Sequence, residues 1–252
     1  TLFDFFARRP ERIPLYEGIQ LLSLAGIAIA LVQCTGTSAV AGARIRDLRR
    51  APFIVMVGGV CAMLLLLWAM RCCPNTAYNP CMRMLSYLGR TQINGVHAPL
   101  CHDLFMAALA ISAGCLARFY PALSCLVKNR SAKALLRWGG ALNAAGLLTI
   151  AFIPENVSGT GHNIGCFAAA CGGAIIILLL TFKRNNPTVS SAIRWGWMIG
   201  CATIISIFSG CLLAHHFHYL PFAPYVPTLQ KIVILSFVAW LLNYAGLLLI
   251  RT

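Results

Sequence analysis

Three histidines gather where an apolar run ends, in the stretch "CLLAHHFHYLPF" at residues 211–222. His215 and His218 are three residues apart, so on a helix their side chains lie on one face. Two imidazoles at that spacing can share a zinc or copper ion, and histidines that face each other can ligate haem. The sequence therefore predicts a metal-binding pair at His215 and His218. The alternative is a set of interfacial histidines with polar tips in water and no bound ion.

A second group that could do chemistry lies near the start of another apolar run. His102 is followed directly by Asp103, so His102 would supply a metal ligand and Asp103 the carboxylate that orients it. A carboxylate at membrane depth is costly unless it is paired or hydrated. His97, His102 and Arg90 are its candidate partners. We expect His97, His102 and Asp103 to contribute to a ligand-binding site, with a structural ion pair as the alternative.

The third group belongs to "IPENVSGTGHN" at residues 153–163. His162 opens the next apolar run, where a helix N-terminus would favour a neutral imidazole or a bound anion. Glu155 lies just ahead of it. We add both residues to the predicted ligand-binding set, and a proton-linked role for its histidines and Asp103 is a further alternative.

Twelve cysteines divide into two kinds. Eight lie within apolar runs or at their ends, where thiols usually behave as small apolar side chains. The other four lie in or beside the longest connection, where one or two disulfides would form if that side is oxidising: Cys72, Cys73, Cys81 and Cys101. The chain has no CxxC pair, which argues against a zinc ribbon or a thioredoxin-type site.

The elements that position these residues must be membrane helices. Of the 252 residues, 59% are hydrophobic and 10% are charged, with a mean hydropathy of +0.77. A soluble domain has about 25% charged residues. A bilayer core about 30 Å thick needs roughly 20 apolar residues per helix, and backbone groups cannot remain unpaired in lipid. The predicted fold is an all-α, polytopic integral membrane helix bundle.

Seven apolar runs are candidate spans, near residues 16–40, 52–70, 101–122, 134–153, 163–182, 192–214 and 229–250. We predict two parts: residues 1–50, an amphipathic lead-in with a candidate first span, and residues 51–252, a six-helix bundle. If residues 16–40 lie on the membrane surface, six helices cross rather than seven.

Basic residues lie mainly in the short connections, so the net charge of +14 indicates membrane topology and contact with anionic lipids rather than nucleic acid. Their distribution favours a cytoplasmic C-terminus in a multipass protein. In that orientation all six histidines, with Asp103 and Glu155, fall at the non-cytoplasmic face.

Small residues at helix-packing spacing occur in two runs. Gly196 and Gly200 form a GxxxG pair, and Gly165 begins a similar series. Such residues let helices approach closely in lipid. We predict plain packing within the bundle, with a homo-oligomer interface or a contact with another membrane subunit as the alternative.

Two patches carry a resemblance. "YNPCMRMLSYLGR" and "FIPENVSGTGHNIGCFAAA" are similar to motifs of the multipass family called domain of unknown function 998, and the layout resembles Frag/DRAM-like six-helix proteins. The resemblance covers about residues 51–252 and maps onto Pro80, Ser86, Leu88, Gly89, Pro154, His162 and Gly165. It implies a six-helix bundle with structural roles for Ser86 and Gly89, and it implies no particular activity.

The leading hypothesis is a membrane protein that binds or transports a lipid or small amphiphile through a polar site at the non-cytoplasmic face. A metal- or haem-dependent membrane enzyme is the second, and a structural subunit of a larger membrane complex is the third. Enzymatic activity and cofactor are left open. The sequence contains no P-loop, dinucleotide fingerprint or nucleophile elbow, which argues against ATP-driven transport by this chain alone.

Overall fold

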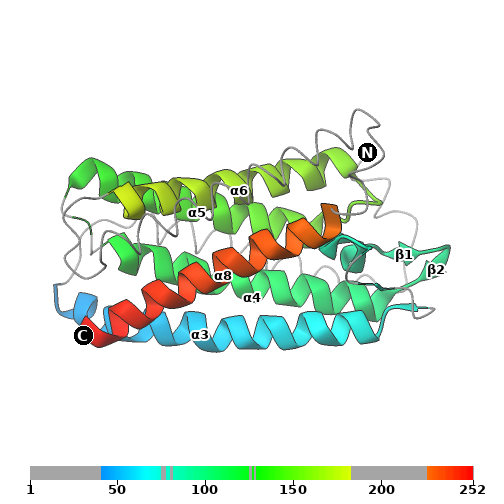
Figure 1. The fold of residues 1–252 in the computed structure, drawn as a ribbon, viewed down its shortest axis with the longest axis horizontal. Helices are drawn as coiled ribbons and strands as arrows, with labels where there is room; N and C mark the ends of the chain where they lie inside the picture. The colour runs from blue at the N-terminus through cyan, green and yellow to red at the C-terminus, as the bar shows by residue number, and fades with distance from the viewer. Residues whose placement is uncertain are drawn as a thin grey trace.

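A computed structural model describes residues 41–74, 78–79, 82–124, 127, 129–182 and 226–251. In these ranges the chain is mostly helical. Its elements in order are α3 (Ala41–Arg71), the 3-10 helix η3 (Leu85–Gly89), β1 (Gln92–Ile93), β2 (Val96–His97), α4 (Pro99–Ser124), α5 (Arg130–Phe152), α6 (Gly159–Phe182) and α8 (Val226–Arg251). The long helices run lengthwise beside one another, and α8 crosses the others obliquely (Figure 1).

The two ends of this bundle differ. One end, called the hairpin end below, holds the β1–β2 hairpin, the end of α3, the α5–α6 connection and the start of α8 (Figure 1). The opposite end holds the start of α3, the link between α4 and α5 and the end of α8. The candidate ligand-binding residues from the sequence, His97, His102, Asp103, Glu155 and His162, all belong to segments at the hairpin end.

In the part of the chain that the structure describes, four helices are long and apolar enough to cross a membrane: Arg50–Arg71, Pro99–Ser124, Arg130–Phe152 and Gly159–Leu180. A further apolar helix covers Val226–Leu242. The prediction of an all-α fold is therefore confirmed for the described residues, and these helices have the length and composition expected of an integral membrane protein. The predicted spans at residues 16–40 and 192–214 lie outside the described residues, so the number of six or seven stays a prediction.

The stretch "RIRDLRR" at residues 44–50 lies between the apolar runs predicted near 16–40 and 52–70, yet it is helical and forms the first turns of α3. It contains no glycine or proline, and arginine and leucine are good helix formers, so charge alone does not end the helix. The helix begins before the apolar segment, and it includes the boundary predicted at residue 50.

Helices α5 and α6 pack backbone to backbone. A Cβ atom on Gly146 would lie 2.3 Å from the amide nitrogen of Ala169, and one on Gly172 would lie 2.4 Å from that of Asn143. Gly165 also lies against α5, since a Cβ there would be 3.0 Å from the amide nitrogen of Ile150. Glycine is required at such distances because any side chain would hold the two backbones apart.

Of the three buried clusters among the described residues, two bear on the site. The larger joins all five long helices and includes Tyr120 of α4, Ile176 of α6 and Trp240 of α8. The second lies beneath the hairpin end and joins the end of α3 to the start of α4, with Leu88 and Ile93 fully buried between them. The hairpin-end connection thus folds onto the bundle and carries its polar residues at fixed positions.

Candidate functional site

The connection between α3 and α4 is shaped by a tight turn and a close approach. Asn94 and Gly95 adopt positive φ angles of 52° and 79°, which is the geometry of a two-residue hairpin turn. Gly89 at the end of η3 lies so near the Phe105 ring that a Cβ there would be 2.6 Å from a ring carbon. The Asn-Gly pair is a strong hairpin signal that our sequence analysis did not use.

Two side chains at the start of α4 hold η3 from below. The thiol of Cys101 donates to the carbonyl of Leu88 at 3.3 Å, and Nδ1 of His102 lies 2.8 Å from the carbonyl oxygen of Gly89. A carbonyl can only accept, so Nδ1 of His102 carries the proton. His102 is buried, and its contact with Gly89 positions η3.

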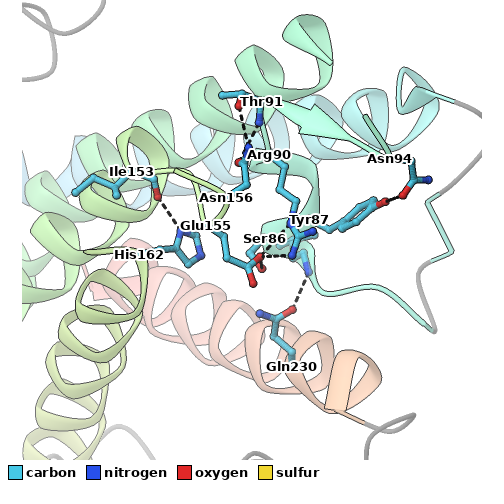
Figure 2. Close-up of polar contacts among 11 residues, drawn as sticks. Ser86, Tyr87, Arg90, Thr91, Asn94, Ile153, Glu155, Asn156, His162 and Gln230 are labelled. Atoms are coloured by element: carbon cyan, nitrogen blue, oxygen red, sulfur yellow. Dashed lines mark hydrogen bonds and ion pairs between the residues drawn. The ribbon is translucent and has the colours of Figure 1, made fainter. Parts of the chain in front are cut away.

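The centre of the candidate site is a carboxylate that receives three donors. Nε and Nη2 of Arg90 donate to Oε2 of Glu155 at 3.3 and 3.2 Å, and the Ser86 hydroxyl donates to the same oxygen at 3.4 Å. Figure 2 shows this group between η3 and the α5–α6 connection. Arg90 and Glu155 are about one-third exposed, so the pair is accessible from outside the protein.

Neighbouring polar contacts join three separate segments. The Thr91 amide donates to Oδ1 of Asn156, and Nδ2 of Asn156 donates back to the Thr91 hydroxyl, at 3.2 and 2.9 Å. The amide of Leu85 donates to Oε1 of Gln230 at 2.8 Å, which attaches η3 to α8 (Figure 2). Arg90, Thr91, Asn156 and Gln230 were not among the predicted site residues. Their shared sequence signal is a polar residue beside an apolar run, which does not show what it meets.

His162 on the first turns of α6 is the second buried histidine of the site. Its Nδ1 lies 2.9 Å from the carbonyl oxygen of Ile153, so Nδ1 carries the proton and Nε2 presents a lone pair in the neutral ring. His162 is only 3% exposed, and its Nε2 has no hydrogen-bond partner. Glu155 lies beside it in Figure 2.

Basic and aromatic side chains surround the same group. The guanidinium groups of Arg83 and Arg90 lie 4.9 and 5.0 Å from the centre of the Tyr87 ring. Nζ of Lys231 lies 5.7 Å from the Tyr78 ring and donates to the carbonyl of Arg83 at 2.6 Å. Burial raises the pKa of Tyr78, so this phenol is neutral at physiological pH. The result is a locally positive surface that suits an anionic group.

The remaining predicted site residues have separate places. His97 is exposed on β2. Asp103 is half-buried on α4 and interacts with another residue. His215, His218, Gly196 and Gly200 lie outside the described residues. Within the described ranges, no group of three or more His, Cys, Asp or Glu side chains could hold a metal ion.

The structure thus brings together Ser86, Glu155 and Arg90, with His162 beside them. In comparisons with family models, curated proteins and solved structures, nothing matches this chain. The similarity to domain of unknown function 998 therefore stays a hypothesis.

Proposed function

We propose that the hairpin end binds the polar head of a lipid or small amphiphile, as part of a membrane binding or transport protein. The observation that carries this proposal is Nε2 of His162, which is buried without a partner next to the Arg90–Glu155 pair. An unsatisfied buried polar atom costs about 1–3 kcal/mol. A ligand that donates a hydrogen bond to it would recover that energy.

The charges around His162 favour a head group with two kinds of polar atom. An ammonium or hydroxyl donor fits between Nε2 of His162 and the Glu155 carboxylate. A phosphate or carboxylate fits the guanidinium groups of Arg83 and Arg90. A zwitterionic amphiphile satisfies both, and it reaches His162 by displacing the partly exposed Arg90–Glu155 pair.

An apolar surface leads from this polar group toward the bilayer. Gln230 and Lys231 lie near the start of α8, and Ile234 and Leu235 follow them by one turn on the same helix faces. Ile234 and Leu235 are 37% and 54% exposed. An acyl chain would lie along these side chains while its head group stays at the hairpin end.

The basic residues support an orientation with the hairpin end on the non-cytoplasmic side. Several arginines occupy the first turns of α3 and α5, at the opposite end of the bundle: Arg44, Arg46, Arg49, Arg50, Arg130 and Arg137. The hairpin end has fewer basic residues, and there Arg90 is neutralised by Glu155. This difference is the one expected for a cytoplasmic opposite end, which includes the C-terminus of α8.

The test is lipid binding to the purified protein in detergent, measured by native mass spectrometry with phosphatidylethanolamine. His162→Asn keeps a donor for the Ile153 carbonyl and removes Nε2, so we expect roughly fivefold weaker binding or more. His97→Asn makes the same substitution on the exposed hairpin and should bind as the wild type does. Equal binding by the wild type and His162→Asn would contradict the proposal.

A further inference from the structure

Two cysteines from different segments meet beneath the hairpin end. Cys73 follows the end of α3, and Cys101 lies in the first turn of α4. Their side chains interact as free thiols, and their exposed fractions are 6% and 0%. Both belong to the buried cluster that includes Tyr87, Leu88 and Phe105.

Cys73 and Cys101 differ from other cysteines of the bundle in where they lie. Cys115, Cys166 and Cys171 lie on helices within the candidate spans, where water-borne oxidants do not reach. Cys73 and Cys101 lie instead where the chain leaves the bundle, at the end that we assign to the non-cytoplasmic side. There a protein disulfide is stable against reduction.

We propose that Cys73 and Cys101 form a disulfide that closes the connection between α3 and α4. The two thiols lose two protons and two electrons, and the electrons pass to the disulfide of a dithiol oxidase, which becomes two thiols. One cysteine thiolate first attacks the oxidase disulfide to give a mixed disulfide. The second then displaces the oxidase sulfur, and the new S–S bond remains in this chain.

The surroundings indicate when this bond forms and which residues it joins. Burial raises the pKa of the Cys73 thiol, so few thiolates are present once the connection has packed. The bond therefore forms while the connection is still folding. Cys72 is the competitor beside it in the chain, but it is only partly buried, whereas Cys73 and Cys101 are both buried in the same cluster.

The bond would strengthen the support of the candidate site. Residues 73–101 include η3, Arg90 and the β1–β2 hairpin, so the disulfide would fix both ends of this segment to the bundle. The inference uses the orientation proposed above, but it does not depend on head-group binding and is measured without any ligand.

The experiment denatures membranes in sodium dodecyl sulfate with excess N-ethylmaleimide present, so that buried free thiols are also blocked, and then digests the protein with trypsin. Cleavage at arginine releases residues 72–83 and 91–118. We expect one cross-linked species of these two peptides, sensitive to reductant, with fragmentation locating the bond at Cys73 and Cys101. Peptides carrying N-ethylmaleimide at both positions would overturn the proposal, as would a bond from Cys72 or Cys81.

Variants provide the matched controls. Cys72→Ser and Cys115→Ala should keep the cross-linked species, because neither removes a partner. Reductant should lower the melting temperature of the wild type in detergent by about 5 °C or more and leave that of a Cys73→Ser, Cys101→Ser double variant unchanged. Should the double variant fail to fold, the peptide measurement on the wild type decides alone. An unchanged wild-type melting temperature under reductant would contradict a closed disulfide.

Discussion

The α5–α6 interface and the hairpin end are held together in opposite ways. Between α5 and α6, backbone meets backbone because Gly146 and Gly172 have no side chain to separate them. At the hairpin end, separate segments meet through polar side chains such as Arg90 and Glu155, which remain about one-third exposed. The first contact depends on the close fit of two backbones, so no other residue can replace these glycines without moving the helices apart. The second consists of bonds that water or a ligand can replace, which is what a binding surface needs.

Two buried polar side chains show the same difference. Asn143 of α5 is 4% exposed and has both ends of its amide satisfied: Oδ1 accepts from the Tyr120 hydroxyl at 2.9 Å, and Nδ2 donates to the Ala169 carbonyl at 2.6 Å. His162 is equally buried but has only Nδ1 satisfied. A polar group with a structural role is paired on all sides. The unpaired atom of His162 therefore marks the hairpin end as the part of the bundle that can accept something more.

The largest expected effect comes from adding one methyl group to the α5–α6 interface. Gly146→Ala would place Cβ 2.3 Å from the Ala169 amide nitrogen, so the helices must move apart. We expect a loss of about 1–3 kcal/mol, measured by thermal unfolding in detergent. Gly114→Ala on α4 is the matched control, because a Cβ there meets nothing within 4 Å. Equal stability of the two variants would show that α5 and α6 are not in direct backbone contact.

A smaller effect is expected at the hairpin turn. Gly95 has a φ of +79° with open space around it, so Gly95→Ala introduces backbone strain without a clash. The strain should cost about 1–2 kcal/mol in the same unfolding measurement. Gly95→Asn should lose less, since asparagine tolerates this conformation. If alanine and asparagine behave alike, the positive φ does not determine the stability of the connection.

Much of the bundle follows from composition, because an apolar run long enough to cross a bilayer has no stable alternative to a helix. The runs predicted near 101–122 and 134–153 correspond to α4 and α5 within a few residues. The start of α3 was missed because we took the arginines at residues 44–50 to end a helix. Arginine side chains need contact with water, but they do not stop the helix from continuing. Charge shows where a helix leaves the membrane and not where it stops.

The candidate site was less predictable, because its contacts join residues far apart in the chain. Glu155 and His162 were identified as polar residues beside a helix start, and no local pattern pairs Glu155 with Arg90, 65 residues earlier. His102 has the composition of a ligand, yet its Nδ1 binds the carbonyl of Gly89. Packing determines whether His102 or His162 keeps an unpaired ring nitrogen. This cannot be deduced from a single sequence.

The smallest effect on stability, and the one that separates the two regions most sharply, is expected at the Arg90–Glu155 pair. A partly exposed ion pair contributes about 1 kcal/mol or less. We expect a double-mutant cycle of Arg90→Gln and Glu155→Gln to give a coupling free energy of unfolding in that range, decreasing as salt is raised. Both single variants should nevertheless weaken phosphatidylethanolamine binding severalfold, because each removes a charge proposed to contact the head group. A coupling well above 2 kcal/mol together with unchanged lipid binding would assign the pair to the support of the fold, as at the α5–α6 interface, and would leave the hairpin end without the replaceable bonds on which its binding role depends.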